Sequence, residues 1–72
     1  MSRVVAIGEA TELAGYALAG VDVIDAADPD LVRRAWERVD DDVGLVLVTA
    51  EARRALSRRI DRQDVLWVVL PA

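Results

Sequence analysis

The sequence predicts an α/β fold, a small open parallel sheet of four strands in the order 2-1-3-4, with the receiver-like or Rossmann-like succession βαβαβαβ. Four apolar, β-branched segments alternate along the chain with three segments whose apolar residues recur at helical spacing. The connections between these segments are short, which favours parallel strands joined by right-handed crossovers. The 72 residues suffice for one hydrophobic core, so we expect residues 1–72 to form a single domain.

The first third of the chain predicts a strand, a helix and a second strand. Residues 3–7 form a nearly uninterrupted apolar run closed by Gly8, which is typical of a strand buried on both faces. Residues 10–18 carry apolar or small side chains at helical spacing, and Gly20 is suited to end that helix. Residues 21–25 then provide a brief second strand.

The middle of the chain predicts an amphipathic helix and a central strand. Asp28 is a favourable N-terminal cap and Pro29 a favourable first residue, so the second helix should begin near Pro29. Trp36 lies on the apolar stripe of this helix and is therefore expected in the core. Residues 43–48 form a second continuous apolar run, which predicts the central strand.

The last third of the chain predicts a third helix and a fourth strand. Thr49 can cap the helix, whose apolar positions continue as far as Ile60. Helical spacing places Arg59 inside this apolar stripe, where its aliphatic stem can pass the edge of the sheet. Residues 61–64 form a polar link, residues 65–70 form the fourth strand, and Pro71 stops it.

The predicted sheet has an uneven cover. With the order 2-1-3-4, the first helix lies on one face and the other two helices lie on the opposite face. The runs at 45–48 and 65–70 are apolar on both alternating sides, so one side of the third and fourth strands lacks a helix from this chain. We therefore expect a protein partner or self-association to cover it. The alternative is a small sheet that tolerates exposed valines.

The composition excludes several classes of function. Thirteen acidic residues outnumber nine basic ones, all arginine, and the net charge of −4 disfavours binding to nucleic acid. The chain has no cysteine and no histidine, which excludes disulfides, thiolate nucleophiles and imidazole bases. No apolar run is long enough for a signal peptide or a membrane span, so we expect a cytoplasmic location without direct membrane insertion.

The loops predict no catalytic residue, cofactor or metal. Gly8 and Gly15 are seven residues apart, which fits neither the dinucleotide motif nor the P-loop, and the chain has no lysine. We expect Gly8 to form a turn and Gly15 to allow close packing of helix on sheet. The acids at 40–42 are interpreted as a solvated connection instead of a divalent-cation site. Receiver-type phosphotransfer lacks its paired acids, acceptor and lysine, and any small enzyme would rely on hydroxyls, carboxylates and arginines.

The charge is unevenly distributed along the chain. Residues 43–72 hold five arginines and three acids, whereas residues 1–42 hold four arginines and ten acids. Such asymmetry can orient docking to a protein partner, and the alternative is a solvated helix face. Trp67 can anchor an interface from the fourth strand. The candidate protein-interaction residues are therefore Trp67, Arg54, Arg58, Arg59 and Arg62.

Two separated motifs resemble one protein family. Residues 8–21 read GEATELAGYALAGV and resemble the opening of the F subunit of archaeal and vacuolar-type rotary ATPases, typically G-D-x-x-T-x-x-G-F-x-L-A-G-V. Glu9 stands for the aspartate, Tyr16 for the phenylalanine, and the helix threonine is displaced to Thr11. Residues 42–49, DVGLVLVT, are similar to the family's D-I-G-V-I-L-I-T strand and helix cap, and residues 66–71 resemble its closing strand and proline.

The resemblance covers nearly the whole chain and implies a role. It implies a non-catalytic subunit of the central stalk, seated beside the coiled-coil shaft subunit and helping to couple ATP turnover to rotation in a complex that the chain joins from the cytoplasm. The family's chain continues past the proline into a tail helix, whereas this sequence ends at Ala72, so we expect a domain similar to the F subunit without that tail. The competing hypothesis is a stand-alone, self-associating regulatory module with a receiver-like fold and no phosphotransfer activity.

Overall fold

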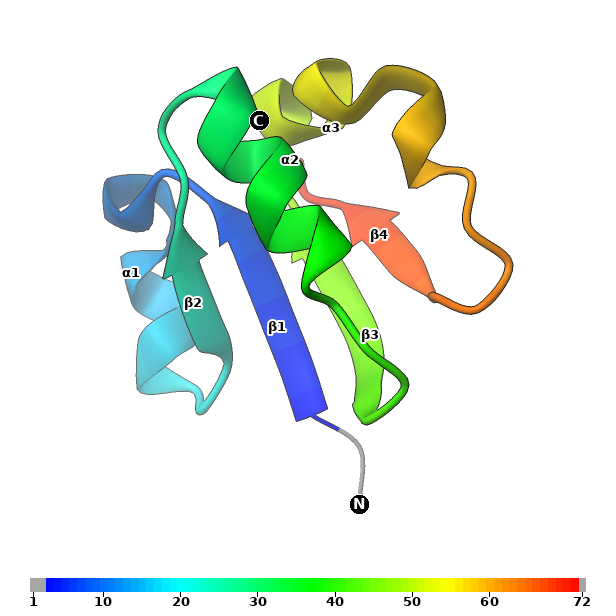
Figure 1. Cartoon of the computed structure of the whole chain (residues 1–72). Helices are drawn as coiled ribbons and strands as arrows, with labels where there is room; N and C mark the ends of the chain where they lie inside the picture. The colour runs from blue at the N-terminus through cyan, green and yellow to red at the C-terminus, as the bar shows by residue number, and fades with distance from the viewer. Residues whose placement is uncertain (1–2, 72) are drawn as a thin grey trace.

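A four-stranded parallel sheet organises the computed structural model, which describes residues 3–71 (Figure 1). The strand order is β2-β1-β3-β4, which confirms the predicted fold class and order. The elements are β1 (Arg3–Gly8), α1 (Ala10–Leu18), β2 (Asp22–Asp25), α2 (Pro29–Glu37), β3 (Val43–Val48), α3 (Ala50–Leu56), the 3-10 helix η1 (Ser57–Ile60) and β4 (Trp67–Val69).

The predicted caps begin the second and third helices. The Asp28 carboxylate accepts a hydrogen bond of 3.0 Å from the backbone N–H of Leu31, and Pro29 occupies the first position of α2. The Thr49 hydroxyl accepts one of 3.1 Å from the backbone N–H of Ala52 in α3. Each side chain satisfies an N–H group that the helix itself leaves without a partner.

The third helix is shorter than its apolar pattern predicts. It ends at Leu56 because Ser57 adopts a φ of 49°, a left-handed conformation that ends the regular turn. The chain continues in η1, where Ile60 turns into the core while Arg59 is exposed. The expectation that Arg59 lies within the apolar stripe of a continuous helix is therefore wrong. The fourth strand is also shorter than predicted, although Val65 before it remains buried.

Hydrophobic side chains from the helices pack against both faces of the sheet. On one face, α2 and α3 cover the larger core, in which the Trp36 side chain is 2% exposed, as predicted from its place on the helical stripe. On the other face, α1 packs against β1 and β2 and buries Leu13 completely. Gly15 of that helix has no atom within 4 Å of an added Cβ. It is exposed, so the prediction that it allows close packing on the sheet is wrong.

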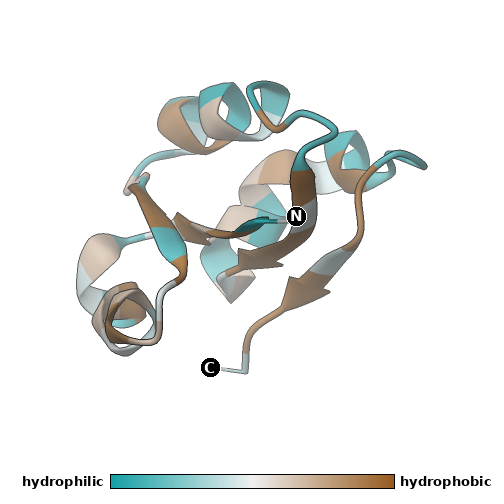
Figure 2. Ribbon diagram, turned by 90° about the horizontal axis from the view of Figure 1, so that it is seen from below, coloured by the Kyte–Doolittle hydropathy of each residue, from teal (hydrophilic) through white to brown (hydrophobic). Residues whose placement is uncertain are grey.

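The cover of the sheet is uneven, as the sequence predicts. Figure 2 shows α2 and α3 on one side of the sheet and α1 on the other side, next to β2. In the described residues 3–71, no helix lies over the α1 side of β3 and β4. Leu66 and Val68 are 67% and 48% exposed there. The molecule thus leaves apolar strand surface in contact with solvent.

Candidate protein-interaction surface

At the crevice in which open α/β sheets bind ligands, the backbone of Gly8 is shielded by a buried side chain. The strand order reverses between β1 and β3, so a ligand of such a fold would sit at the carboxyl ends of these two strands. Gly8 ends β1 with a φ of +158°, and a Cβ added there would lie 2.3 Å from Cγ2 of Thr49. The Thr49 side chain is buried and rests on the Gly8 backbone. It occupies the space through which a phosphate group would approach the glycine.

The same end of the sheet is acidic. A shallow cavity of about 80 Å³ has Glu9, Glu12, Asp28 and Glu51 as its charged lining. Asp25 lies beside it and accepts a hydrogen bond of 3.0 Å from the first N–H of α1. Asp25 and Asp28 thus serve as partners of helix N–H groups, and the whole acidic set repels a phosphate-bearing ligand. Among residues 3–71, no group of three or more acidic side chains converges as a metal site does.

The acids at 40–42 lie at the opposite end of the sheet, before β3. A hydrogen bond between the carboxyl groups of Asp40 and Asp42 lowers the pKa of Asp40 and raises the pKa of Asp42. Asp42 also forms an ion pair of 3.3 Å with Arg3, whose guanidinium is 3.5 Å from Asp22. These contacts join the amino ends of β1, β2 and β3, where the side chains remain largely exposed.

Trp67 lies on the core side of β4. Its register with Val46 places it on the face that α3 covers, and its half-buried ring packs against the hydrophobic core. The Arg53 guanidinium lies 5.7 Å from the centre of this ring, within the range of a cation–π contact. Arg53 was not among the residues predicted from the sequence, because the contact joins different elements and no local pattern marks it.

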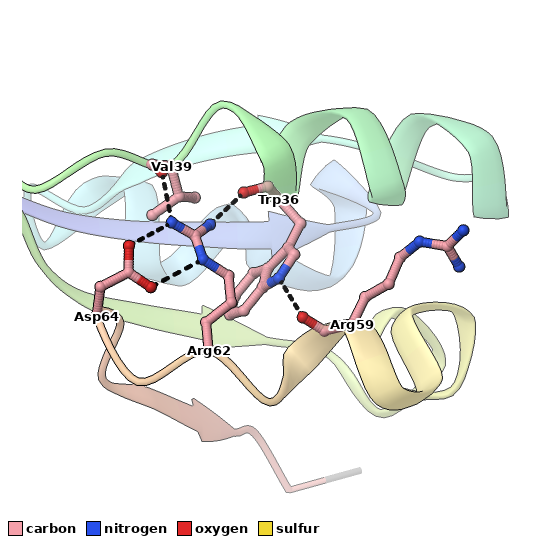
Figure 3. A network of polar contacts seen from close by, with 5 residues as sticks. All are labelled: Trp36, Val39, Arg59, Arg62 and Asp64. Atoms are coloured by element: carbon pink, nitrogen blue, oxygen red, sulfur yellow. Dashed lines mark hydrogen bonds and ion pairs between the residues drawn. The ribbon is translucent and has the colours of Figure 1, made fainter.

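Arg62 is held by contacts within the chain (Figure 3). Its guanidinium donates to the carbonyl oxygens of Trp36 at 2.9 Å and Val39 at 3.1 Å, and to both carboxylate oxygens of Asp64 at 3.1 and 2.8 Å. It also lies 5.5 Å from the centre of the Trp36 ring, whose Nε1 donates to the Arg59 carbonyl at 2.8 Å. Hydrogen bonding between the two side chains lowers the pKa of Asp64 and raises that of Arg62. This network fastens the segment after α3 to the end of α2.

The remaining three candidate arginines point away from the core. Arg54, Arg58 and Arg59 are exposed, and none forms an ion pair with a carboxylate in residues 3–71. Arg54 borders a groove of about 430 Å³ between α1 and the end of β4. Arg59 borders a shallow depression beside Trp36 and Arg62. Within residues 3–71, three of the five predicted residues are thus cations without a carboxylate partner, and the other two, Trp67 and Arg62, hold β4 and the segment after α3 in place.

Comparison with known proteins gives a family and a similar fold. Residues 4–72 match the model of the family described as ATP synthase (F/14-kDa) subunit. The crystal structure of the F subunit of the V-type ATP synthase from Archaeoglobus fulgidus superposes with a TM-score of 0.61 at 22% identity, over 93% of this chain and 96% of that chain. At that identity the likeness concerns the fold alone. No curated protein matches this chain in sequence.

Proposed function

This chain belongs to the family of ATP synthase (F/14-kDa) subunits, and from that premise we propose that it is a non-catalytic subunit of the central stalk of a V/A-type rotary ATPase. In this role it couples ATP turnover to rotation, and so to the transport of protons or sodium ions, through protein contacts alone. The observation that carries the proposal is the apolar surface of β3 and β4, which no described helix covers. Large exposed apolar patches of this kind mark contacts with other proteins.

The proposed partner is the coiled-coil shaft subunit of the same complex. In residues 3–71 no helix is long and apolar enough to cross a membrane. We propose that the chain reaches the membrane-bound machine as a peripheral subunit in the cytoplasm. The shielded backbone of Gly8 and the acidic side chains around it support a role without a bound nucleotide.

The exposed arginines of α3 and η1 form the second part of the proposed docking surface. Arg54, Arg58 and Arg59 lack carboxylate partners in the described chain, so they remain available for acidic side chains of a partner. Unpaired charges at the rim of an interface contribute to the association rate and to orientation more than to affinity. Trp67 and Arg62 support this surface by holding β4 and the segment after α3 in place.

Co-purification tests the proposal. The chain is produced together with the shaft subunit of the same organism's rotary ATPase, and the complex is isolated by size-exclusion chromatography. We expect a stable complex, with an association rate at low salt that falls several-fold in the double variant Arg54→Glu/Arg58→Glu. The variant Arg34→Glu/Arg38→Glu is the matched control, because it reverses two exposed arginines in α2 and at its C-cap with the same change in net charge. Absence of any complex with the wild-type chain would refute the proposed function.

Self-association as a stand-alone regulatory module is the second candidate. The observation that favours it is the outer edge of β4, which is unpaired in the described residues and whose apolar side chains include Val69 at 37% exposure. Such an edge can pair with a strand of another copy. Light scattering over a range of concentrations decides between the two. A dimer that persists at low concentration favours this module, whereas a monomer favours an absent partner.

A further inference from the structure

We infer that the outer edge of β2 binds an extended, acidic segment of a partner protein, which joins the sheet as a further strand and places carboxylates against Arg34 and Arg38. The inference goes beyond the proposed function, because it concerns the edge of the sheet opposite to β4 (Figure 1). It adds a second contact and the chemistry of the segment that makes it.

The outer edge of β2 offers backbone donors and acceptors to another strand. The Ala26 N–H donates to the Gly8 carbonyl at 2.8 Å, toward β1. Backbone groups of successive residues in a strand point to opposite sides, so those of Ile24 also face β1, whereas those of Val23 and Asp25 face outward. Among residues 3–71, no strand pairs with this outer side. An extended segment of another protein can therefore add there by main-chain hydrogen bonds.

A groove of about 390 Å³ follows this edge, between β2 and α2. Its apolar lining consists of Ile24, Leu31 and Ala35. Ile24 is half-buried, and Leu31 is 43% exposed. On the opposite face of the strand, which α1 covers, Val23 is also half-buried. An added strand would therefore bury apolar surface on both faces of the sheet.

Two exposed arginines border the groove. Arg34 lies on α2 and Arg38 is the C-cap residue of this helix, and neither forms an ion pair with a carboxylate in residues 3–71. A spacing of four residues corresponds to about 6 Å along a helix. Alternate side chains on one face of a strand lie about 6.6 Å apart. Acidic residues at alternate positions of the added strand therefore match the two guanidinium groups.

The acids close to the groove have other partners within the described chain. Asp25 is the one carboxylate in the lining, and it accepts the first N–H of α1 at 3.0 Å, on the other face of the sheet. Asp30 of α2 pairs with Arg33. At the amino end of β2, Asp22 pairs with Arg3 at 3.5 Å. The two arginines that border the groove are thus available to carboxylates of another protein.

A second copy of this chain does not supply the required segment. Within residues 3–71, the strands with an open edge are β2 and β4. The residues of β4, Trp67–Val69, include no acid. The two acids of β2, Asp22 and Asp25, already have partners. The net charge of −4 also opposes close contact between copies.

A synthetic peptide in which valine and glutamate alternate tests the inference. It carries a fluorophore and is titrated with the whole chain by fluorescence anisotropy at about 0.15 M salt, where distant charges are screened. We expect saturable binding that weakens at least tenfold in the double variant Arg34→Glu/Arg38→Glu. Arg54→Glu/Arg58→Glu is the matched control, because it reverses two exposed arginines elsewhere with the same change in net charge. It should change the dissociation constant less than twofold.

Two further measurements separate strand addition from attraction by charge. A peptide of the same composition, with its valines and glutamates in separate blocks, should bind at least tenfold more weakly, because its glutamates no longer share one face of a strand. Backbone hydrogen exchange followed by NMR locates the bound peptide. The outward amides of Val23 and Asp25 should exchange at least tenfold more slowly with the alternating peptide. The amide of Val69, on the outer edge of β4, should change less than twofold.

Four results would overturn the inference. Equal binding of the two peptides, or an equal loss in the two double variants, indicates adsorption by charge alone. Absence of saturable binding up to about 1 mM peptide shows that the edge does not bind such a segment. Slower exchange at Val69 instead of Val23 places the peptide on the wrong edge. Protection of Val23 that appears without peptide, as the concentration of the chain rises, makes a second copy the occupant. Binding to the shaft subunit is measured separately, so none of these results contradicts the proposed function.

Discussion

Replacing Arg62 by methionine should destabilise this domain substantially, although the residue lies in a polar segment between η1 and β4. The methionine keeps part of the side-chain volume but removes the guanidinium donors that reach the carbonyl oxygens of Trp36 and Val39. The Trp36 carbonyl keeps a backbone hydrogen bond of 3.1 Å from the N–H of Val39, whereas Arg62 is the partner of the Val39 carbonyl, just beyond the end of α2. The substitution therefore removes one of two hydrogen bonds at Trp36 and leaves the part-buried Val39 carbonyl without its partner.

The expected loss follows from the individual contacts. The Val39 carbonyl, left without a partner, costs about 1 kcal/mol, and the second hydrogen bond of the Trp36 carbonyl contributes about 0.5 kcal/mol. The contact of the guanidinium with the Trp36 ring contributes about 0.5–1 kcal/mol. The ion pair with the exposed Asp64 adds little, because water screens it. The free energy of unfolding should therefore fall by about 2–2.5 kcal/mol. A domain of this length has a total of about 4–11 kcal/mol, so the change is easy to measure.

Urea unfolding followed by far-UV circular dichroism measures this loss. Arg62→Lys keeps the charge but lacks the planar guanidinium with its fixed set of donors. It should therefore restore less than half of the unfolding free energy that Arg62→Met loses. Asp64→Asn is the matched control, because it removes the ion pair and leaves the carbonyl contacts in place. An unfolding free energy for Arg62→Met within about 0.5 kcal/mol of the wild type, the range of an ordinary surface substitution, would refute the assignment of Arg62 as a clamp.

Three further changes test other parts of the structure. Trp36→Ala should lower the free energy of unfolding by about 3–5 kcal/mol in urea titrations, since the side chain is 2% exposed, whereas Trp67→Ala should cost less stability and weaken binding to the shaft subunit more. Gly8→Ala should cost about 1–3 kcal/mol in the same titration, because the added Cβ would lie 2.3 Å from a buried side chain; an unchanged urea midpoint would contradict that packing. Hydrogen bonding to Arg62 lowers the folded-state pKa of Asp64 below its ordinary value of 3.8. The contribution of the Asp64 carboxylate to the free energy of unfolding is thus present above pH 3.8 and is lost as the pH falls further. Because Asp64 is exposed, this contribution is small. Asp64→Asn should therefore make the acid limb of the thermal melts only slightly less steep, and a steeper limb would argue against the ion pair.

Local signals made most of the fold predictable. Asp28 with Pro29, and Thr49 before an apolar helix, determine helix starts through contacts within three residues. The apolar runs 3–7 and 43–48 identify strands because short β-branched runs of this kind are typical of the inner strands of a parallel sheet, as β1 and β3 are. For the strand order 2-1-3-4, the handedness of the short connections then assigns each helix to one face of the sheet. These steps need no knowledge of contacts between distant residues.

The features that were predicted wrongly, or missed, depend on contacts or strain that the local pattern does not contain. The end of α3 is determined by the left-handed conformation of Ser57, a residue that rarely adopts it, and the prediction for Arg59 failed with it. Arg62 reaches α2 across more than twenty residues of sequence, and Arg53 reaches Trp67 from another element. The arginine-rich composition of this segment is visible in the sequence, but its spacing does not distinguish an arginine that clamps the fold from one that is free.

The shielded Gly8 and the exposed face of β3 and β4 both depend on where large side chains lie. Thr49 fills the position beside Gly8 where a doubly wound sheet would admit a phosphate. At the carboxyl ends of the strands, this side chain thus packs against Gly8 and caps α3. Val68 in β4 and Leu66 just before it, in contrast, remain exposed although the segment that carries them has the composition of a core strand. Such residues add little stability to the isolated domain, because their transfer from water is incomplete. They add more when a partner covers them, as the proposed contact with another subunit of the complex would.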